Sequence, residues 1–384
     1  MSPSQATYVE DPSRIRDLEK GASKVSLPAF YRPELDALRF LAFILVFLFH
    51  FPFHDLPKVI LNIAGAGTVG VCLFFLLSSY LITELLQRED DRTHNIHLRG
   101  FYLRRVLRIW PLYFFTLFFA RLLELHSPAV QMTWPRILAS IALAGNWYTF
   151  FYGMPTSFAR VLWSISVEEQ FYLFWPSVQK WLGKRALLLI GLATLPTSFF
   201  TIYWLASTSH SDTQIWVNTL VQAQYFGIGG VIAILLRHNE PRFSIAARTL
   251  LLTAGLIFWY MPHRVFHGLP TPQQAIGQYA CITVGTVFIF FSFLGFAQLR
   301  HARALIYLGK ISYGLYVFHL LAIRIAVRGE APLQRFLPSP LVQLALAIVA
   351  FAISLLMAHL SYRYFESPFL RLKRRFEVVH SRAI

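Results

Sequence analysis

Long apolar runs separated by short charged segments dominate the sequence. The runs at 186–205, 280–299 and 341–360 each reach the roughly 20 residues that a helix needs to cross the hydrocarbon layer of a membrane. So many runs of this length cannot all be packed into one water-soluble core. The pattern therefore predicts an all-α, polytopic bundle of membrane-spanning helices.

Ten of the runs are candidate spans. They lie at about 37–54, 67–87, 109–125, 164–182, 186–206, 214–236, 249–262, 274–298, 304–325 and 340–362. An eleventh apolar stretch, 137–151, is short for a span and contains the polar or amphipathic residues Asn146, Trp147 and Tyr148. This composition favours an interfacial or re-entrant segment there.

The composition agrees with a membrane protein and argues against a nucleic-acid-binding one. The 384 residues are 56% hydrophobic and 14% charged, whereas soluble domains have roughly 25% charged residues. The net charge of +16 raises nucleic acid as a partner. The basic residues lie in short clusters between apolar runs, however, as the positive-inside rule describes, so we expect the bilayer as partner and no nucleic acid.

The basic residues also orient the chain. With ten spans and a cytoplasmic N-terminus, 26 of the 35 Lys and Arg residues lie on the cytoplasmic side and 8 on the outer side, with Arg39 inside the first span. A full crossing by 137–151 would abolish this asymmetry. We therefore expect both termini in the cytoplasm of a multi-pass cell membrane protein, in the inner membrane if the source is bacterial.

We expect three regions along the chain. Residues 1–30 are polar, lack the apolar core of a signal peptide and form a flexible cytoplasmic segment. Residues 31–368 form one membrane domain, and 369–384 form a basic cytoplasmic tail. The two cysteines, Cys72 and Cys281, are far apart within apolar runs, which predicts neither a disulfide framework nor a metal site.

The first predicted span contains ionisable residues that a membrane helix rarely carries. Arg39 and His50 are eleven residues apart, so they project from nearly the same face, about 16 Å apart along the axis. Arginine in a span costs about 2.5–3.5 kcal/mol, so Arg39 should face a cavity or a partner. The alternative is that Arg39 extends to the headgroups, aided by Asp36. For His50, catalysis and a packing role both remain open.

Two further polar pairs lie near predicted span ends. Arg105 and Arg108 share one helical face and could bind the phosphates of a cytosolic ligand bidentately; the alternative is an anchor to anionic lipid. Glu168 and Glu169 open the fourth span, where helix capping explains one carboxylate. We expect the other to face His50 and to orient its ring, without deciding which. For His319 we expect a packing or helix-bridging hydrogen bond.

Taken together, these motifs resemble the acyltransferase-3 family of integral membrane acyltransferases, which includes enzymes that O-acetylate bacterial surface polysaccharides. RPELDALR at 32–39, with His50 after it, is similar to the family's opening RPEIDGLRA…H helix. GVCLFFLLSSYLIT at 70–83, RVLRIWP at 105–111 and WSISVEEQFY at 163–172 match further motifs in order, as do 313–319 and 362–368. The resemblance covers about residues 31–372. Cys72 and Ser79 depart from the family's usual aspartate and glycine.

The resemblance implies an O-acyltransferase with acyl-CoA, expected to be acetyl-CoA, as donor substrate and with no permanently bound cofactor. It implies a hydroxyl-bearing glycan or glycolipid acceptor. Arg39 and His50 would be essential, and Arg105 and Arg108 would help to bind the donor. We therefore predict Arg39, His50, Glu168 and Glu169 as catalytic residues, with His50 as general base or as the carrier of a covalent acyl group. The alternative from another class is a transporter or flippase for a lipid or sugar.

Overall fold

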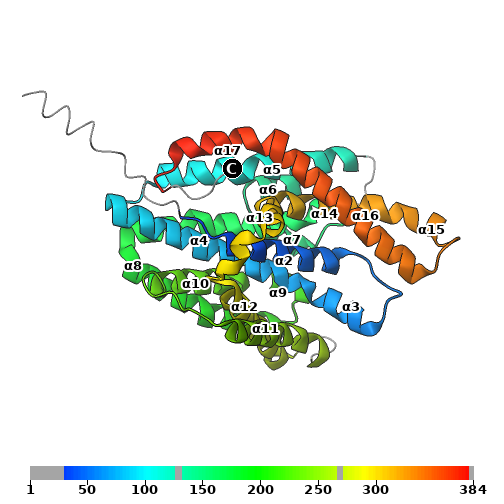
Figure 1. The fold of residues 1–384 in the computed structure, drawn as a ribbon, viewed down its shortest axis with the longest axis horizontal. Coiled ribbons are helices and arrows are strands. Elements are labelled where there is room, and N and C mark those ends of the chain that lie inside the picture. The colour runs from blue at the N-terminus through cyan, green and yellow to red at the C-terminus, as the bar shows by residue number, and fades with distance from the viewer. Residues whose placement is uncertain (1–29, 126–131, 266–270, 380–384) are drawn as a thin grey trace, which may run out of the picture.

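The computed structural model describes residues 30–125, 132–265 and 271–379, and within these ranges it contains helices and no strand. Most long helices lie along the long axis of the molecule and pack side by side (Figure 1). The predicted all-α bundle is therefore confirmed. Nearly all of the predicted segment 1–30 and the last five residues of the tail lie outside the described residues. The helices are α2 (Pro33–His50), α3 (Lys58–Gly65), α4 (Gly70–Thr93), α5 (Leu98–Glu124), α6 (Trp134–Ile141), α7 (Gly145–Tyr152), α8 (Leu162–Ser207), α9 (Asp212–Val217), α10 (Thr219–Leu235), α11 (Ile245–Val265), α12 (Pro272–Phe293), α13 (Arg303–Lys310), α14 (Ser312–Ala326), α15 (Glu330–Leu333), α16 (Ser339–Leu360) and α17 (Ser367–Lys373), with short 3₁₀ and π turns between some of them.

Six helical segments of the described chain are long and apolar enough to cross a membrane. A seventh is added if α13 and the helical segment that follows it, which meet at a bend of 72°, form one span. Helix α2 contains three charged residues and α10 has only 17 residues, so neither meets the same criteria. The chain is a multi-pass membrane protein, whereas the count of ten spans and the cytoplasmic termini stay predictions.

Helix α8 contains two of the predicted spans. Its 46 residues would extend about 69 Å, more than twice the thickness of the hydrocarbon core. The helix breaks at Gly183, where φ is 78° and ψ is 177°, a conformation that is costly for residues other than glycine. This break lies between the predicted spans 164–182 and 186–206.

The stretch 137–151 does not form a single long helix. It is divided between α6 and α7, which have eight residues each and extend only about 12 Å each. Leu143, between them, has a positive φ of 58°, and α6 and α7 pack against each other. Such a pair of short helices agrees with the predicted interfacial or re-entrant segment rather than with an eleventh helical span.

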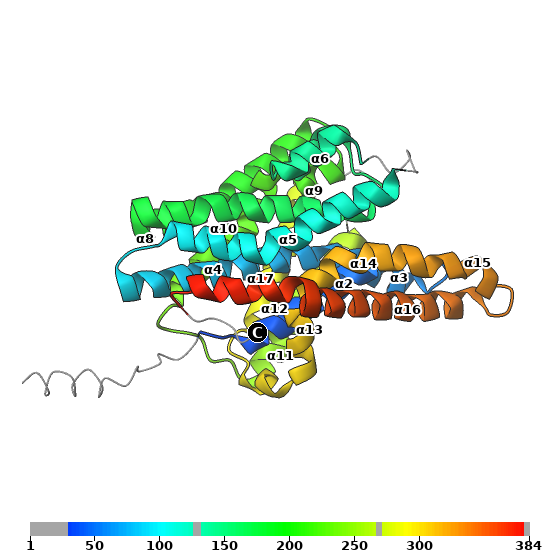
Figure 2. The same cartoon turned by 90° about the horizontal axis from the view of Figure 1, so that it is seen from above.

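Helix α2 lies in the interior of the bundle, beside α4, α13 and α14 (Figures 1 and 2). It begins with Pro33 and has Glu34 and Asp36 in its first turn, where proline fits and acidic side chains interact favourably with the helix dipole. It ends at His50, because Phe51 is extended and precedes Pro52, as residues before proline commonly are. The helix therefore ends four residues before the predicted end of the span at 54.

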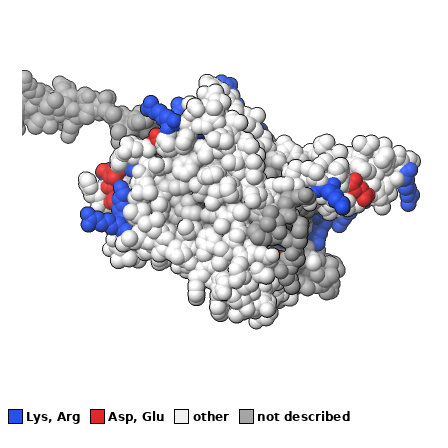
Figure 3. Space-filling view, turned by 90° about the horizontal axis from the view of Figure 1, so that it is seen from below, with Lys and Arg blue, Asp and Glu red and all other residues white. Residues whose placement is uncertain are grey.

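Charged residues on the surface gather mainly toward the two ends of the long axis. Figure 3 shows one face on which a broad middle band is uncharged, as a surface in contact with lipid requires. Tyr31, near the start of the described chain, and Lys373, near its end, line the same cavity. The two ends of the described chain therefore lie on the same side of the bundle, which agrees with an even number of crossings.

A close contact between α2 and α13 makes Gly309 a sensitive position. A Cβ atom there would lie 1.9 Å from the Asp36 carbonyl oxygen, whereas a Cβ at Gly329 would come no closer than 3.5 Å to any neighbour. We expect Gly309→Ala to destabilise the protein by about 1–3 kcal/mol, the usual effect of overpacking, and Gly329→Ala to have little effect. Thermal unfolding in detergent measures both. Equal midpoints for the two variants would contradict this.

Candidate active site

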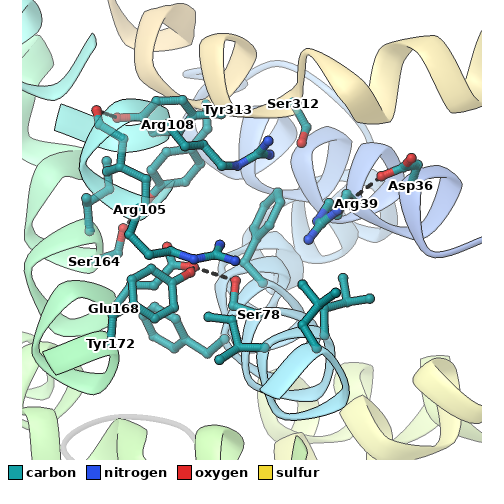
Figure 4. Close-up of a pocket in the computed structure, with 18 of the residues that line it drawn as sticks. Asp36, Arg39, Ser78, Arg105, Arg108, Ser164, Glu168, Tyr172, Ser312 and Tyr313 are labelled. Carbon is teal, nitrogen blue, oxygen red and sulfur yellow. Dashed lines mark hydrogen bonds and ion pairs between the residues drawn. The ribbon is translucent and has the colours of Figure 1, made fainter. Parts of the chain in front are cut away.

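A cavity of about 170 Å³ carries an excess of positive charge (Figure 4). Helices α2, α4, α5, α8 and α14 all contribute to its walls. Its charged side chains, five basic and two acidic, are Arg32, Arg39, Arg105, Arg108, Lys373, Asp36 and Glu168. We call it the cationic cavity. Its composition suits a ligand with several negative charges.

Arg105 and Arg108 lie one turn apart on α5 and both line the cationic cavity. The Arg105 guanidinium lies over the ring of Tyr172, 5.3 Å from its centroid, and over Phe101, at 5.4 Å. Within the described chain neither arginine forms a hydrogen bond or an ion pair through its side chain, and the buried Nε of Arg105 has no partner. These two side chains therefore face the cavity with N–H groups available to a ligand, which favours the phosphate-binding role over a lipid anchor.

Arg39 is fixed at the wall of the cationic cavity by α2 itself. Its Nη1 donates to Asp36 Oδ1 at 3.0 Å, and the Tyr31 hydroxyl donates to the other oxygen of Asp36 at 3.0 Å. Only 18% of the Arg39 side chain is exposed. Arg39 therefore faces a cavity and has a partner, as the cost of an arginine in a span requires.

Glu168 belongs to the same cavity. Its Oε1 accepts hydrogen bonds from the hydroxyls of Ser78 on α4 and Tyr172 one turn further along α8 (Figure 4). These contacts join α4 to α8 and place a carboxylate near Arg105. Glu168 therefore links two helices of the wall of the cationic cavity, and its negative charge balances part of the positive charge of that cavity.

A second, larger cavity of about 580 Å³ contains His50. We call it the histidine cavity. Its polar and aromatic wall residues include Thr68, Arg160, Trp163, Asp212, Thr213, Trp216, Trp259, Gln278, Tyr279 and Tyr316. Among the described residues that line it, one arginine and one aspartate are the only ones with a full charge besides the titratable His50. The two cavities thus differ in charge: one is strongly basic and the other is nearly balanced.

His50 and His319 form a pair across the interface of α2 and α14. Nε2 of His319 lies 3.1 Å from Nδ1 of His50, and the ring centroids are 5.0 Å apart. Nδ1 of His319 lies 2.6 Å from the Tyr316 carbonyl oxygen, and Nδ1 of His50 lies 2.9 Å from the Val46 carbonyl oxygen. The helix-bridging hydrogen bond predicted for His319 is therefore present, and its partner is His50.

These contacts decide which nitrogen of each neutral ring carries the proton. A carbonyl oxygen can only accept, so Nδ1 of His319 must carry a proton and donate to Tyr316. Its Nε2 then has a lone pair and accepts from Nδ1–H of His50, which also faces the Val46 carbonyl. In this arrangement Nε2 of His50 is left with its lone pair, the form that a general base requires.

The two cavities meet at a thin partition. Val71 and Tyr316 line both of them. The Tyr316 hydroxyl lies 2.6 Å from Oγ of Ser164, which lines the cationic cavity. Val71, Tyr316 and Ser164 therefore form the wall at which the two cavities adjoin.

The predicted orientation of His50 by Glu168 or Glu169 is wrong. Glu168 faces the cationic cavity, and Glu169 accepts a hydrogen bond from the Trp110 indole N–H of α5 at 2.9 Å. Successive residues on a helix point about 100° apart, and in this structure neither direction leads to His50. His319 takes the position that we expected for a glutamate.

Several site residues could not be assigned from the sequence. His319 was predicted only as a packing or bridging residue, although its motif at 313–319 was a signal, and Arg160 carried no signal at all.

The two departures from the family pattern lie outside both cavity walls: Cys72 is fully buried, and Ser79 donates to the Phe226 carbonyl. Neither replacement therefore removes a polar group from a cavity.

Comparison with known proteins agrees with the sequence motifs. A family model described as an acyltransferase domain matches residues 32–359. The chain is 27% identical over 374 residues to the peptidoglycan O-acetyltransferase OatA of Listeria monocytogenes and 26% identical over 366 residues to the O-acetyltransferase OatA of Staphylococcus aureus. Each match covers 88% of this chain but only 56% and 57% of the relative, so the chain spans little more than half their length. No solved structure matches.

Proposed function

Because the chain belongs to the acyltransferase-3 family of membrane acyltransferases, we propose that it transfers an acyl group, specifically acetyl, from acyl-CoA to a hydroxyl of a cell-envelope glycan. The observation that carries this proposal is the pair of cavities that meet at Val71 and Tyr316. One is basic and suits the donor, and the other contains a histidine poised as a base. The similarity to enzymes named as O-acetyltransferases, one of them a peptidoglycan O-acetyltransferase, supports an O-acetyl transfer.

The donor belongs in the cationic cavity. Coenzyme A carries several phosphate charges, and arginine binds phosphate through two parallel, charge-assisted hydrogen bonds. Arg105 and Arg108 have N–H groups that no described protein group occupies, and Arg39 lies on the same cavity wall. Because the cavity is small, we expect it to hold the narrow pantetheine arm, with the bulkier nucleotide nearer its mouth. The thioester would then reach the partition at Tyr316.

His50 performs the proton transfer. Its Nε2 takes the proton from the acceptor hydroxyl as that oxygen attacks the thioester carbonyl carbon. The C–S bond then breaks, and the protonated ring returns the proton to the leaving thiolate, so that the products are the O-acyl ester and CoA with a free thiol. An imidazole suits both steps because it can accept and return a proton near neutral pH.

Arg39 acts on the donor rather than on the reacting carbonyl. It lines the cationic cavity and is paired with Asp36, whereas His50 lines the other cavity. The separation of about 16 Å along α2 places the two side chains at different parts of one extended donor. Arg39 therefore steers the acyl-CoA into position.

Purified protein in nanodiscs tests this function. With acetyl-CoA and a glycan fraction of the cell envelope, we expect release of free CoA thiol and the appearance of acetyl esters on the glycan by mass spectrometry. A transporter or flippase, the alternative from another class, would move its cargo across the bilayer without releasing CoA. Absence of both thiol and ester would reject the enzymatic proposal.

His319 is a positioning residue in this mechanism, and replacing it gives a graded prediction. We expect His319→Leu to lower kcat by about 10- to 100-fold, because the Nδ1–H of His50 loses one of its two acceptors and keeps only the Val46 carbonyl, a loss of about 1–3 kcal/mol. His319→Gln offers a side-chain carbonyl oxygen and should restore part of this rate. The KM for acetyl-CoA should stay unchanged in both variants, since His319 does not line the cationic cavity.

Steady-state kinetics with acetyl-CoA as the varied substrate separates the two parameters. Equal rates for the leucine and glutamine variants, or a rise in KM with kcat preserved, would show that His319 only fills space.

A further inference from the structure

One part of the wall of the histidine cavity carries a row of aromatic rings. The centroid of Trp216 lies 6.4 Å from that of Trp163 and 6.3 Å from that of Tyr279. All three line the cavity. Trp163 and Tyr279 are buried and Trp216 is half-buried, and within the described chain neither indole N–H of the two tryptophans donates to a protein group. We call these three residues the aromatic row.

Three polar side chains that line the same cavity make no hydrogen bond to a described protein group. Arg160, Asp212 and Gln278 line the cavity, and none of the three side chains makes a hydrogen bond or an ion pair with another described residue. Each ends in a planar group with two polar atoms side by side. Such groups bind two neighbouring hydroxyls of a sugar ring at once, while the flat, apolar face of the ring packs against an aromatic side chain.

Charge separates this cavity from the donor site. The cationic cavity has three more basic than acidic side chains, whereas Arg160 and Asp212 balance each other in the histidine cavity. A polyanion is therefore drawn to the first cavity, and an uncharged polyol fits the second. The cavity volume of about 580 Å³ lies within the range of small-molecule sites.

On this basis, and resting on the function proposed above, we propose that the histidine cavity is the acceptor site and binds a sugar ring of an uncharged glycan segment. The ring packs against Trp216 in the aromatic row. Its hydroxyls bond to Arg160, Asp212 and Gln278, and the accepting hydroxyl faces Nε2 of His50. The specificity of the enzyme for its acceptor is then set by this cavity rather than by the donor site.

Binding of soluble oligosaccharides tests the proposal without any acyl transfer. The protein in nanodiscs is mixed with chitotetraose, cellotetraose or maltotetraose, and with tetragalacturonate as an acidic counterpart, and binding is followed by ligand-observed NMR. At least one neutral oligosaccharide should bind, and more tightly than the acidic one. Trp216→Leu should weaken this binding by about tenfold or more, whereas Trp216→Phe should retain most of it.

Trp181→Leu is the matched control. Trp181 is 70% exposed on α8 and lines neither cavity, so its replacement should leave oligosaccharide binding unchanged. Retained binding of acetyl-CoA shows that each variant is folded. The proposal is overturned if no neutral oligosaccharide binds, if only the acidic one does, or if Trp216→Leu and Trp181→Leu behave alike. Release of CoA thiol from acetyl-CoA with the envelope glycan fraction, measured without the soluble oligosaccharides, tests the proposed function separately, so the two failures are distinguishable.

Discussion

Replacing His50 with alanine is expected to lower the rate of acyl transfer by about 10²- to 10⁴-fold, the range that a positioned general base contributes. The reason is that the contacts of His50 use its Nδ1–H and leave the lone pair of its Nε2 available to accept a proton in the histidine cavity. Binding of acetyl-CoA should persist, since Arg105 and Arg108 lie in the other cavity. Single-turnover transfer and equilibrium binding of acetyl-CoA in nanodiscs measure the two properties separately.

His54 provides the control for this variant. It lies four residues further along the chain, its side chain is 50% exposed, and it lines neither cavity. His54→Ala should therefore transfer acetyl groups at the unaltered rate. Transfer by His50→Ala at the rate of the unmodified protein would remove the base from the mechanism. Rapid quenching followed by mass spectrometry of the peptide that contains His50 would distinguish a base from a covalent acyl carrier.

The sequence predicts the fold well because the membrane restricts it strongly. Every backbone group in lipid needs an internal hydrogen bond, so an apolar run of about 20 residues can hardly be anything but a helix. The ends of helices are predicted less well, because hydropathy identifies the apolar part of a helix that lies in the membrane and not the polar turns by which the helix extends beyond it. Helix α5 begins at Leu98, eleven residues before the predicted span at 109–125, and so includes both Arg105 and Arg108, which we call the RxxR motif.

The partners within the site could not be predicted in the same way. Helical spacing places Arg39 and His50 on one face of α2, and both do line cavities. Periodicity identifies the face of a helix but not the neighbour that the face contacts. His319 is 269 residues from His50 and Ser78 is 90 residues from Glu168. These pairs depend on how α14 packs against α2 and how α8 packs against α4, which a single sequence does not specify.

The separation of the polar groups into two cavities explains why one face of α2 contains both an arginine and a histidine. In the proposed mechanism the donor occupies one cavity and the acceptor the other, so the reacting groups of the two substrates meet at the partition between the cavities. Arg39 and His50 lie toward opposite ends of α2, and Val71 and Tyr316 form the shared partition between the cavities. The interior position of α2 would then place both substrates beside one rigid helix, which favours a fixed distance between the proposed donor site and the base.

Removing both arginines of the RxxR motif is the strongest test of the donor site. Each charge-assisted hydrogen bond to a phosphate is worth about 1.5–3 kcal/mol, so Arg105→Ala and Arg108→Ala together should raise the KM for acetyl-CoA by about 100-fold or more. Acetyl-pantetheine lacks the nucleotide phosphates and should show the same KM with the double variant as with the unmodified protein. Arg99→Ala, an exposed position in the first turn of α5, should leave both values unchanged. Steady-state kinetics with the two donors gives these values. An equal rise in KM for acetyl-CoA and acetyl-pantetheine would instead mean that the arginines hold the cavity open and do not bind phosphate.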